Sequence, residues 1–193
     1  MRKILLYIIA YLILCYGNCF ASAEILNSEF KPARLSADSV RLKLKQVFTS
    51  YVGTKELTGN NDGEIVESFL ASVGLPKGYA WCAAFVKHCM DRVNVKTRIT
   101  AWAPSAVPRN LCVWMQGKVI KRLPKCGDVF GVYYANLKRI GHVGFIREWK
   151  FDSPYAATTE GNTNSQNSRE GNGVYERIRL KRQIHIVVNW IGA

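Results

Sequence analysis

The sequence predicts an α+β fold in which N-terminal helices pack against an antiparallel β-sheet. Apolar residues recur at helical spacing in the first half of the chain, and from Lys125 onward they alternate with a period of two. Helices that precede the strands, instead of alternating with them, favour an antiparallel sheet covered by helices. The 193 residues suffice for one domain, and no internal repeat indicates a solenoid.

The helical region contains three predicted helices. Ser36 is placed to cap the first, and Gly53 stops its apolar pattern. Asp62 is placed to cap the second, which ends at Gly74, and the third runs over about 80–92. The second helix is expected to turn one set of apolar residues inward: Ile65, Val66, Phe69, Leu70 and Val73.

The β region contains five predicted strands, separated by turn-forming residues. They span residues 128–134, 141–149, 155–160, 174–180 and 184–190. Two stretches lack either period and are expected to be loop-like, namely residues 101–117 and the Gly/Asn/Ser-rich residues 161–173.

The N-terminus is expected to be a signal peptide covering residues 1–23. Arg2 and Lys3 supply its positive charge, Ile4–Leu14 is a nearly unbroken apolar run, and Ala21-Ser22-Ala23 offers the small residues that precede cleavage. An uncleaved anchor is the alternative, although the run is shorter than the ~20 apolar residues of a membrane span.

Cleavage at that point would export the chain to the periplasm or the extracellular space, with no attachment to the membrane. We divide the exported part into a lead-in and helix at residues 24–55 and a main domain at residues 56–193, and we expect a monomer.

The chain is strongly basic. Its net charge is +13, and +11 remains once Arg2 and Lys3 are removed. This charge favours anionic partners, which for an exported protein are cell-envelope polymers and lipid head groups. No recognition helix, zinc-finger spacing or aromatic RNA motif is visible, so nucleic acid is not expected as a partner. A solvated basic surface without a specific partner is the alternative.

Four cysteines follow the signal peptide: Cys82, Cys89, Cys112 and Cys126. An even number in an oxidising compartment is typical of disulfides. If Cys82 stays a free thiol, one bridge remains, and we expect it between Cys112 and Cys126. Cys89 lies on an apolar helix face and is read as a buried residue.

Cys82 is the candidate nucleophile. It stands at the predicted start of the third helix, where the positive end of the helix dipole favours a thiolate, and a nearby imidazolium would favour it further. The alternative is a small core residue on an apolar face.

His142 is the candidate base. It lies on an alternating strand beside Gly141 and Gly144, which leave room for another backbone or a substrate. A hydrogen-bonded structural histidine is the alternative. The other histidines fit less well, because His88 follows Cys82 by six residues on the same helix and His185 has no polar neighbour.

Glu160 and Asn162 stand at the end of the third predicted strand. Glu160 can accept a hydrogen bond from the second ring nitrogen of His142 and fix its tautomer. Asn162 can support the same histidine or help to bind the oxyanion of a tetrahedral intermediate. Ordinary turn chemistry at a strand end is the alternative for both residues.

No metal or cofactor is expected. Cys82, His88 and Cys89 lack the paired spacing of structural zinc ligands. The cluster at residues 60–64 suggests calcium, but it lacks the ligand pattern of an EF-hand, so we interpret it as a turn and helix cap.

Together these residues resemble the CHAP domain, a branch of the papain-like NlpC/P60 group of bacterial peptidoglycan amidases and endopeptidases. The matching motifs are Trp81-Cys82-Ala83-Ala84-Phe85-Val86, Gly127-Asp128-Val129, Gly141-His142-Val143-Gly144-Phe145 and Glu160-Gly161-Asn162, preceded by residues 59–63 and 75–78. The resemblance implies a papain-like fold, with Cys82 as nucleophile, His142 as base, Glu160 orienting His142, and Asn162 assisting.

The chain departs from the family at two places. Cys126 stands where the family usually has proline, and the acidic loop through which some members bind calcium is missing at the matching place. The resemblance implies hydrolysis of peptidoglycan stem peptides, either as an N-acetylmuramoyl-L-alanine amidase or as a peptide endopeptidase. The alternatives are a cysteine peptidase or isopeptidase acting on secreted protein, and a catalytically silent wall-binding module of the same fold.

Overall fold

The computed structural model describes residues 36–164 and 171–192. The predicted signal peptide and residues 24–35 of the predicted lead-in therefore lie outside the described residues. Among the helices that are described, none has the length and apolar character needed to cross a membrane.

The described chain is α+β, as predicted. Its α-helices are α2 (Ala37–Ser50), α3 (Glu64–Ala71) and α4 (Cys82–Arg92). Four short 3-10 helices follow, namely η1 (Ala103–Ala106), η2 (Arg109–Leu111), η3 (Ala135–Leu137) and η4 (Lys181–Gln183). Ser36 caps α2 as predicted, because its hydroxyl accepts a hydrogen bond from the Ser39 backbone N–H at 3.2 Å.

The predicted cap of the second helix is wrong. Gly63, at a φ of 102°, precedes α3, and the Asp62 carboxylate instead accepts hydrogen bonds from the backbone and the hydroxyl of Thr58, at 2.9 and 2.7 Å. The short side chain of Asp62 therefore closes the preceding turn. Ile65 is also 46% exposed and does not face inward as predicted.

The sheet has seven antiparallel strands in the order β2-β1-β7-β3-β4-β5-β6. The strands are β1 (Cys112–Met115), β2 (Lys118–Val119), β3 (Val129–Tyr134), β4 (Arg139–Trp149), β5 (Tyr155–Thr163), β6 (Gly173–Leu180) and β7 (Ile186–Val188). The five predicted strands correspond to β3 to β7. The sequence missed β1 and β2, because a hairpin of such short strands shows no measurable period.

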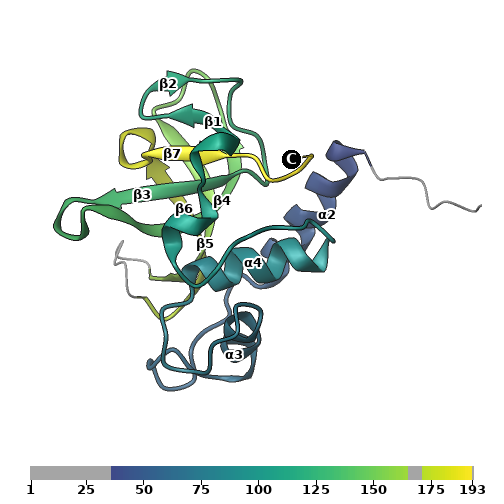
Figure 1. Cartoon of the computed structure of the whole chain (residues 1–193), viewed down its shortest axis with the longest axis vertical. Coiled ribbons are helices and arrows are strands. Elements are labelled where there is room, and N and C mark those ends of the chain that lie inside the picture. Colours follow the sequence, from purple (N-terminus) through teal and green to yellow (C-terminus); the bar gives the residue numbers. More distant parts are fainter. Residues whose placement is uncertain (1–35, 165–170, 193) are drawn as a thin grey trace, which may run out of the picture. The chain divides into compact units, whose positions relative to one another are not determined.

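The α4 helix packs against β4 and β5, and α2 and α3 pack against α4 (Figure 1). Phe145 of β4 is stacked on Phe48 at a centroid distance of 4.9 Å and meets Phe85 edge-on. Gly161 lets β5 approach α4, since a Cβ there would lie 2.7 Å from Trp81 and 2.8 Å from Phe85. Close packing of this kind fixes the start of α4 against the sheet.

The α2 helix belongs to the same compact unit as the rest. This unit begins at Ser36, and Leu44 and Phe48 of α2 are fully buried in its core. The predicted boundary between residues 55 and 56 stays a prediction.

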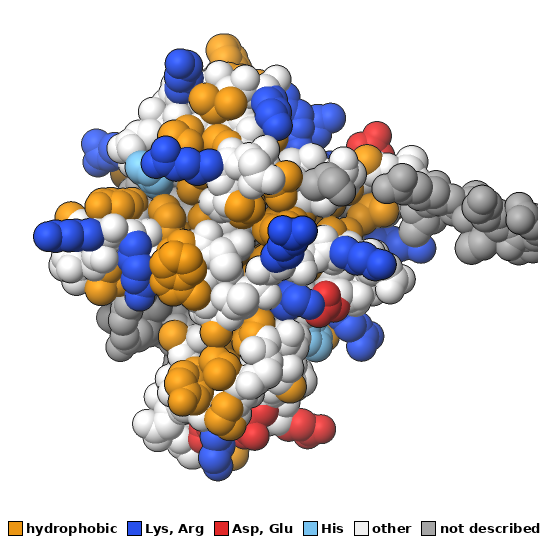
Figure 2. All heavy atoms as spheres, in the orientation of Figure 1, with side chains coloured by type: hydrophobic (Ala, Val, Ile, Leu, Met, Phe, Trp, Pro, Cys, Tyr) orange, Lys and Arg blue, Asp and Glu red, His pale blue; other side chains and the backbone are white. Residues whose placement is uncertain are grey.

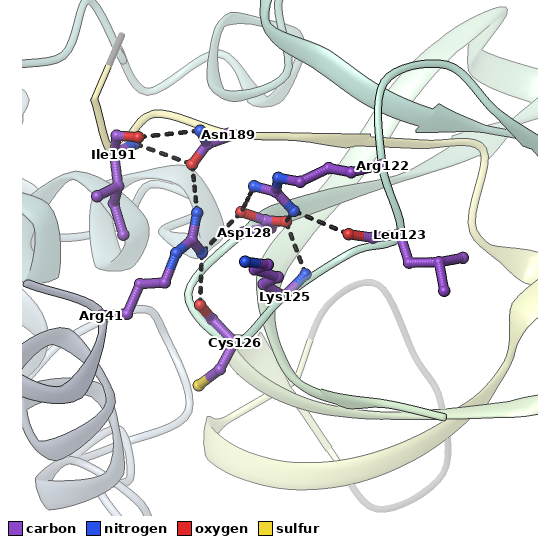
Figure 3. Close-up of polar contacts among 8 residues, drawn as sticks. All are labelled: Arg41, Arg122, Leu123, Lys125, Cys126, Asp128, Asn189 and Ile191. Atoms are coloured by element: carbon purple, nitrogen blue, oxygen red, sulfur yellow. Dashed lines mark hydrogen bonds and ion pairs between the residues drawn. The ribbon is translucent and has the colours of Figure 1, made fainter. Parts of the chain in front are cut away.

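A buried carboxylate, Asp128, ties α2 to the start of β3 (Figure 3). Its oxygens accept hydrogen bonds from Arg41 at 2.9 Å, from Arg122 at 2.7 and 2.9 Å, and from the Lys125 backbone at 2.8 Å. Arg41 also donates to the carbonyl of Cys126 at 2.7 Å. We call these residues the Asp128 cluster.

The predicted Cys112–Cys126 disulfide is wrong for this structure, in which all four described cysteines are free thiols. Cys112 is buried at the start of β1, and its thiol donates to the carbonyl of Trp114 at 3.3 Å. Cys126 is partly exposed in the turn before β3, and burial raises the pKa of its thiol. The disulfide was expected because Cys112 and Cys126 were the two cysteines left without another role. That argument contains no information about the distance between them or the direction of their side chains.

Candidate active site

Cys82 is the first residue of α4, as the sequence predicted, and 6% of it is exposed. The preceding Trp81 is fully buried, and its indole N–H donates to the Glu56 carboxylate at 2.8 Å. Glu56 also accepts from the backbone of Asn61 at 3.1 Å, so one side chain anchors both the loop and the start of α4. The thiol is thereby held at the positive end of the helix dipole.

His142 lies fully buried on β4. Its Nε2 and an oxygen of Glu160 are 2.8 Å apart. Its Nδ1 is also buried and makes no hydrogen bond of standard geometry within the described residues. Cys82 interacts with the ring strongly enough to shift the pKa of both groups. Because Glu160 occupies Nε2, we assign Nδ1 as the nitrogen that serves the thiol.

Gly144 makes room for the carboxylate partner of His142. A Cβ at this position would lie 2.9 Å from the Glu160 side chain and 2.9 Å from the Thr159 carbonyl. Gly141 similarly makes room for Tyr134 and Leu137. The glycines that flank His142 therefore allow other parts of the chain to approach closely, as the sequence suggested for a backbone or a substrate.

Glu160 is fully buried on β5 and has three side-chain partners. Besides His142, it accepts two hydrogen bonds from Arg179, at 2.5 and 2.6 Å, and one from the Thr158 hydroxyl at 2.6 Å. Arg179 is only 4% exposed and lies over the ring of Phe130 at 5.7 Å. We call His142, Glu160, Arg179 and Thr158 the Glu160 cluster.

Sequence reasoning missed Arg179 and Thr158. Arg177 and Arg179 stand two residues apart on β6, so they lie on the same face of the strand. Nothing in the local sequence indicates that only Arg179 is buried. The signal that was available is indirect. A buried carboxylate on β5 requires a cation, and the next strand in the chain is the first place to look for it.

The three reactive groups shift one another's pKa. Burial alone would raise the pKa of Cys82, but the contact with His142 and backbone hydrogen bonds from Val143 and Ala83 outweigh it, so the pKa is lowered. Burial alone would lower the pKa of His142, but Cys82 and Glu160 raise it to about 9. Despite burial, His142 and Arg179 hold the pKa of Glu160 well below its usual range.

These directions favour a thiolate, an imidazolium and a carboxylate together at neutral pH. Such a pair of sulfur and imidazolium is the reactive form of a cysteine nucleophile, because the thiolate and not the thiol attacks carbonyl carbon. The arrangement is able to perform acyl transfer.

Among the contacts of the described residues, the Asn162 side chain is bonded to none of Cys82, His142 and Glu160. It is 2% exposed, has a left-handed backbone with a φ of 54°, and donates from its side-chain amide to Asn61 at 2.8 Å. It therefore links the end of β5 to the loop that precedes α3. The predicted support of His142 by Asn162 is not among these contacts, and its role in binding an oxyanion stays a prediction.

The described residues contain no group of three or more His, Cys, Asp and Glu side chains placed to hold a metal. In the loop that suggested calcium, the Asp62 carboxylate is engaged by Thr58, whose hydroxyl also accepts from Asn60 at 2.9 Å. His88, which follows Cys82 by six residues on α4, forms a hydrogen bond of 2.8 Å with the hydroxyl of Tyr51.

No model of a known protein family matches this chain, and no curated protein matches it. Among solved structures, a mutated form of RipA, described as a resuscitation promoting factor interacting protein, is similar with a TM-score of 0.45 and 13% sequence identity. The similarity covers 83% of this chain and 67% of that one. A likeness at this level identifies neither a family nor a reaction, so function has to be inferred from the side chains of the site.

Proposed function

We propose that this chain is an exported cysteine hydrolase with a papain-like fold that cleaves amide bonds in peptidoglycan stem peptides. The observation that carries the proposal is the fully buried contact of 2.8 Å between His142 and Glu160, with the other ring nitrogen left for a thiol at the start of a helix. A nucleophile, a base and an orienting carboxylate are the parts that such an enzyme needs.

The proposed reaction has two steps. The Cys82 thiolate attacks the amide carbonyl carbon, and the His142 imidazolium gives its proton to the leaving amine as the carbon–nitrogen bond breaks, which leaves a thioester. Neutral His142 then takes a proton from water as the water oxygen attacks the thioester. The carbon–sulfur bond breaks, the carboxylic acid leaves, and the thiolate and imidazolium are restored.

Glu160 and Arg179 act through His142. Glu160 holds the ring by its Nε2 and stabilises its positive charge, so that Nδ1 faces the thiol. Arg179 binds both oxygens of Glu160 and keeps this carboxylate ionised and fixed. Asn162 is proposed to assist from the end of β5, near the loop that contains Asn61.

The choice of peptidoglycan rests on the ordered motifs that resemble the CHAP domain and on the basic charge of the chain, which suits an anionic polymer. The proposal covers two bonds, the muramoyl–L-alanine amide and a peptide link within or between stems. No metal has a part in the mechanism.

The test uses residues 24–193 and their Cys82→Ala variant on purified peptidoglycan, with released fragments identified by mass spectrometry. We expect the parent to release fragments and the variant to be slower by about 10⁴-fold or more, because the nucleophile is lost. The fragment masses identify the bond that is cut. If parent and variant release the same fragments at the same rate, Cys82 is not the nucleophile and the proposal fails.

A further inference from the structure

A second charged feature lies outside the active site. Residues 92–127 contain eight Lys or Arg and no Asp or Glu. More than half of the net charge of +13 therefore lies in this one segment, which begins at the last residue of α4 and includes η1, η2, β1 and β2. Figure 2, drawn in the orientation of Figure 1, shows Lys and Arg side chains around the region of β1 and β2. Charge gathered in this way favours an anionic partner.

The segment, together with Trp190, lines a hollow with a free volume of about 610 Å³. Two exposed cations, Lys96 and Arg98, lie at this hollow, and no ion pair engages either of them within the described residues. Its apolar lining includes Pro108, Leu111 and Trp190. The hollow therefore combines uncompensated positive charge with an apolar surface.

A second hollow of about 280 Å³ shares Leu111 with the first. Its cations are Lys121 and Arg122. Arg122 is held by Asp128, whereas Lys121 is exposed and makes only a long contact of 3.4 Å, with a backbone carbonyl. Among the described residues, no carboxylate lines either hollow. The two hollows thus form one basic surface, which we call the Leu111 surface.

We propose that the Leu111 surface binds carboxylates of a peptidoglycan strand other than the one being cut. The identity of the polymer rests on the proposed function. Carboxylates of the stem peptides fit Lys96, Arg98 and Lys121, and sugar rings and alanine methyl groups fit the apolar lining. A partner that offers charge alone, such as a phosphate chain, would leave the apolar lining unused.

Lys96 of the Leu111 surface is separated from Cys82 by the length of α4. Cys82 begins α4, the helix is roughly 16 Å long at 1.5 Å per residue, and Lys96 follows its far end. Contacts at the Leu111 surface are therefore expected to hold the enzyme on the polymer without changing the chemistry at Cys82.

The test measures binding without cleavage, using the Cys82→Ala chain and sedimentation with peptidoglycan from which attached anionic polymers have been removed. We expect Lys96→Gln with Arg98→Gln to weaken binding about tenfold at low salt. The matched control, Lys43→Gln with Lys45→Gln, removes the same charge from the exposed face of α2 and should change binding less than twofold. Equal losses in both pairs would overturn the proposal.

A second arm identifies the group that is bound. Amidation of the peptidoglycan carboxyls should reduce binding of the Cys82→Ala chain at least to the level of its Lys96→Gln/Arg98→Gln variant on untreated polymer, and should abolish the difference between the two chains. If amidation has no effect, or if DNA or a phosphate polymer competes at lower concentration than soluble peptidoglycan, the proposal is overturned.

With Cys82 intact, the Lys96→Gln/Arg98→Gln variant should cleave a small soluble stem peptide at the parental rate. A parent that cleaves nothing while these binding differences persist would refute the proposed hydrolase and leave the Leu111 surface standing.

Discussion

Asp128 and Glu160 are both buried carboxylates held by arginines, but they differ in what else they hold. Asp128 is bound by Arg41, Arg122 and a backbone N–H, none of which is a catalytic base or nucleophile. Glu160 is bound by Arg179 and by His142, whose charge can change. A buried carboxylate paired with arginine therefore supports the fold in the Asp128 cluster and the proposed chemistry in the Glu160 cluster.

The largest expected effect is a loss of catalytic rate when the Glu160 cluster, and not the Asp128 cluster, is changed. Glu160→Gln should lower the rate of peptidoglycan cleavage by roughly 10²- to 10⁴-fold, because the imidazolium loses its counter-charge and the amide can favour the wrong tautomer. The measurement is kcat on a soluble stem peptide, well below the unfolding temperature. A rate within threefold of the parent would show that Glu160 is structural, like Asp128.

Asp128→Asn is the matched change in the other cluster. It should destabilise the chain by about 3 kcal/mol, because Arg41 and Arg122 lose their buried counter-charge, while the kcat of the folded protein stays within twofold. Urea unfolding measures the first quantity and the stem-peptide assay the second. A loss of kcat comparable to that of Glu160→Gln would remove the distinction between the clusters.

The pH dependence of cleavage should report Cys82 and the Glu160 cluster, and not the Asp128 cluster. Above a pH of about 9 His142 loses its proton, so the leaving amine is no longer protonated and the rate falls. On the other side of the profile the rate falls as Cys82 gains a proton. This happens at a pH below the usual pKa of a thiol, because the contact with His142 lowers the pKa of Cys82. Asp128→Asn should leave both limits in place, whereas Glu160→Gln should move the alkaline limit to lower pH.

The sequence predicted the parts of the site that local patterns encode. Helical period placed Cys82 at the start of a helix, and alternation placed His142 and Glu160 on strands. It did not reveal Arg179, because which arginine of β6 is buried depends on the register between β5 and β6. It also assigned Asp62 as the cap of the second helix, although its carboxylate closes a turn with Thr58.

Contacts between distant segments were the other limit. The link between Asn162 and Asn61 joins residues 101 positions apart, and the contact of Arg41 with Asp128 spans 87. Such pairs leave no periodic trace in a single sequence, so the Asp128 cluster was not foreseen, although the apolar face of α2 was.

The most direct test of the central claim is the pH dependence of Cys82 alkylation, followed by mass spectrometry of the modified residue. If Cys82 forms a thiolate–imidazolium pair with His142, alkylation should be nearly as fast at pH 7 as at pH 8.5. The Glu160→Gln variant should require a higher pH to reach that rate. If Cys82 of the parent instead reacts as an ordinary thiol, with a rate that rises only around pH 8.5, no such pair exists and the account of the site is wrong.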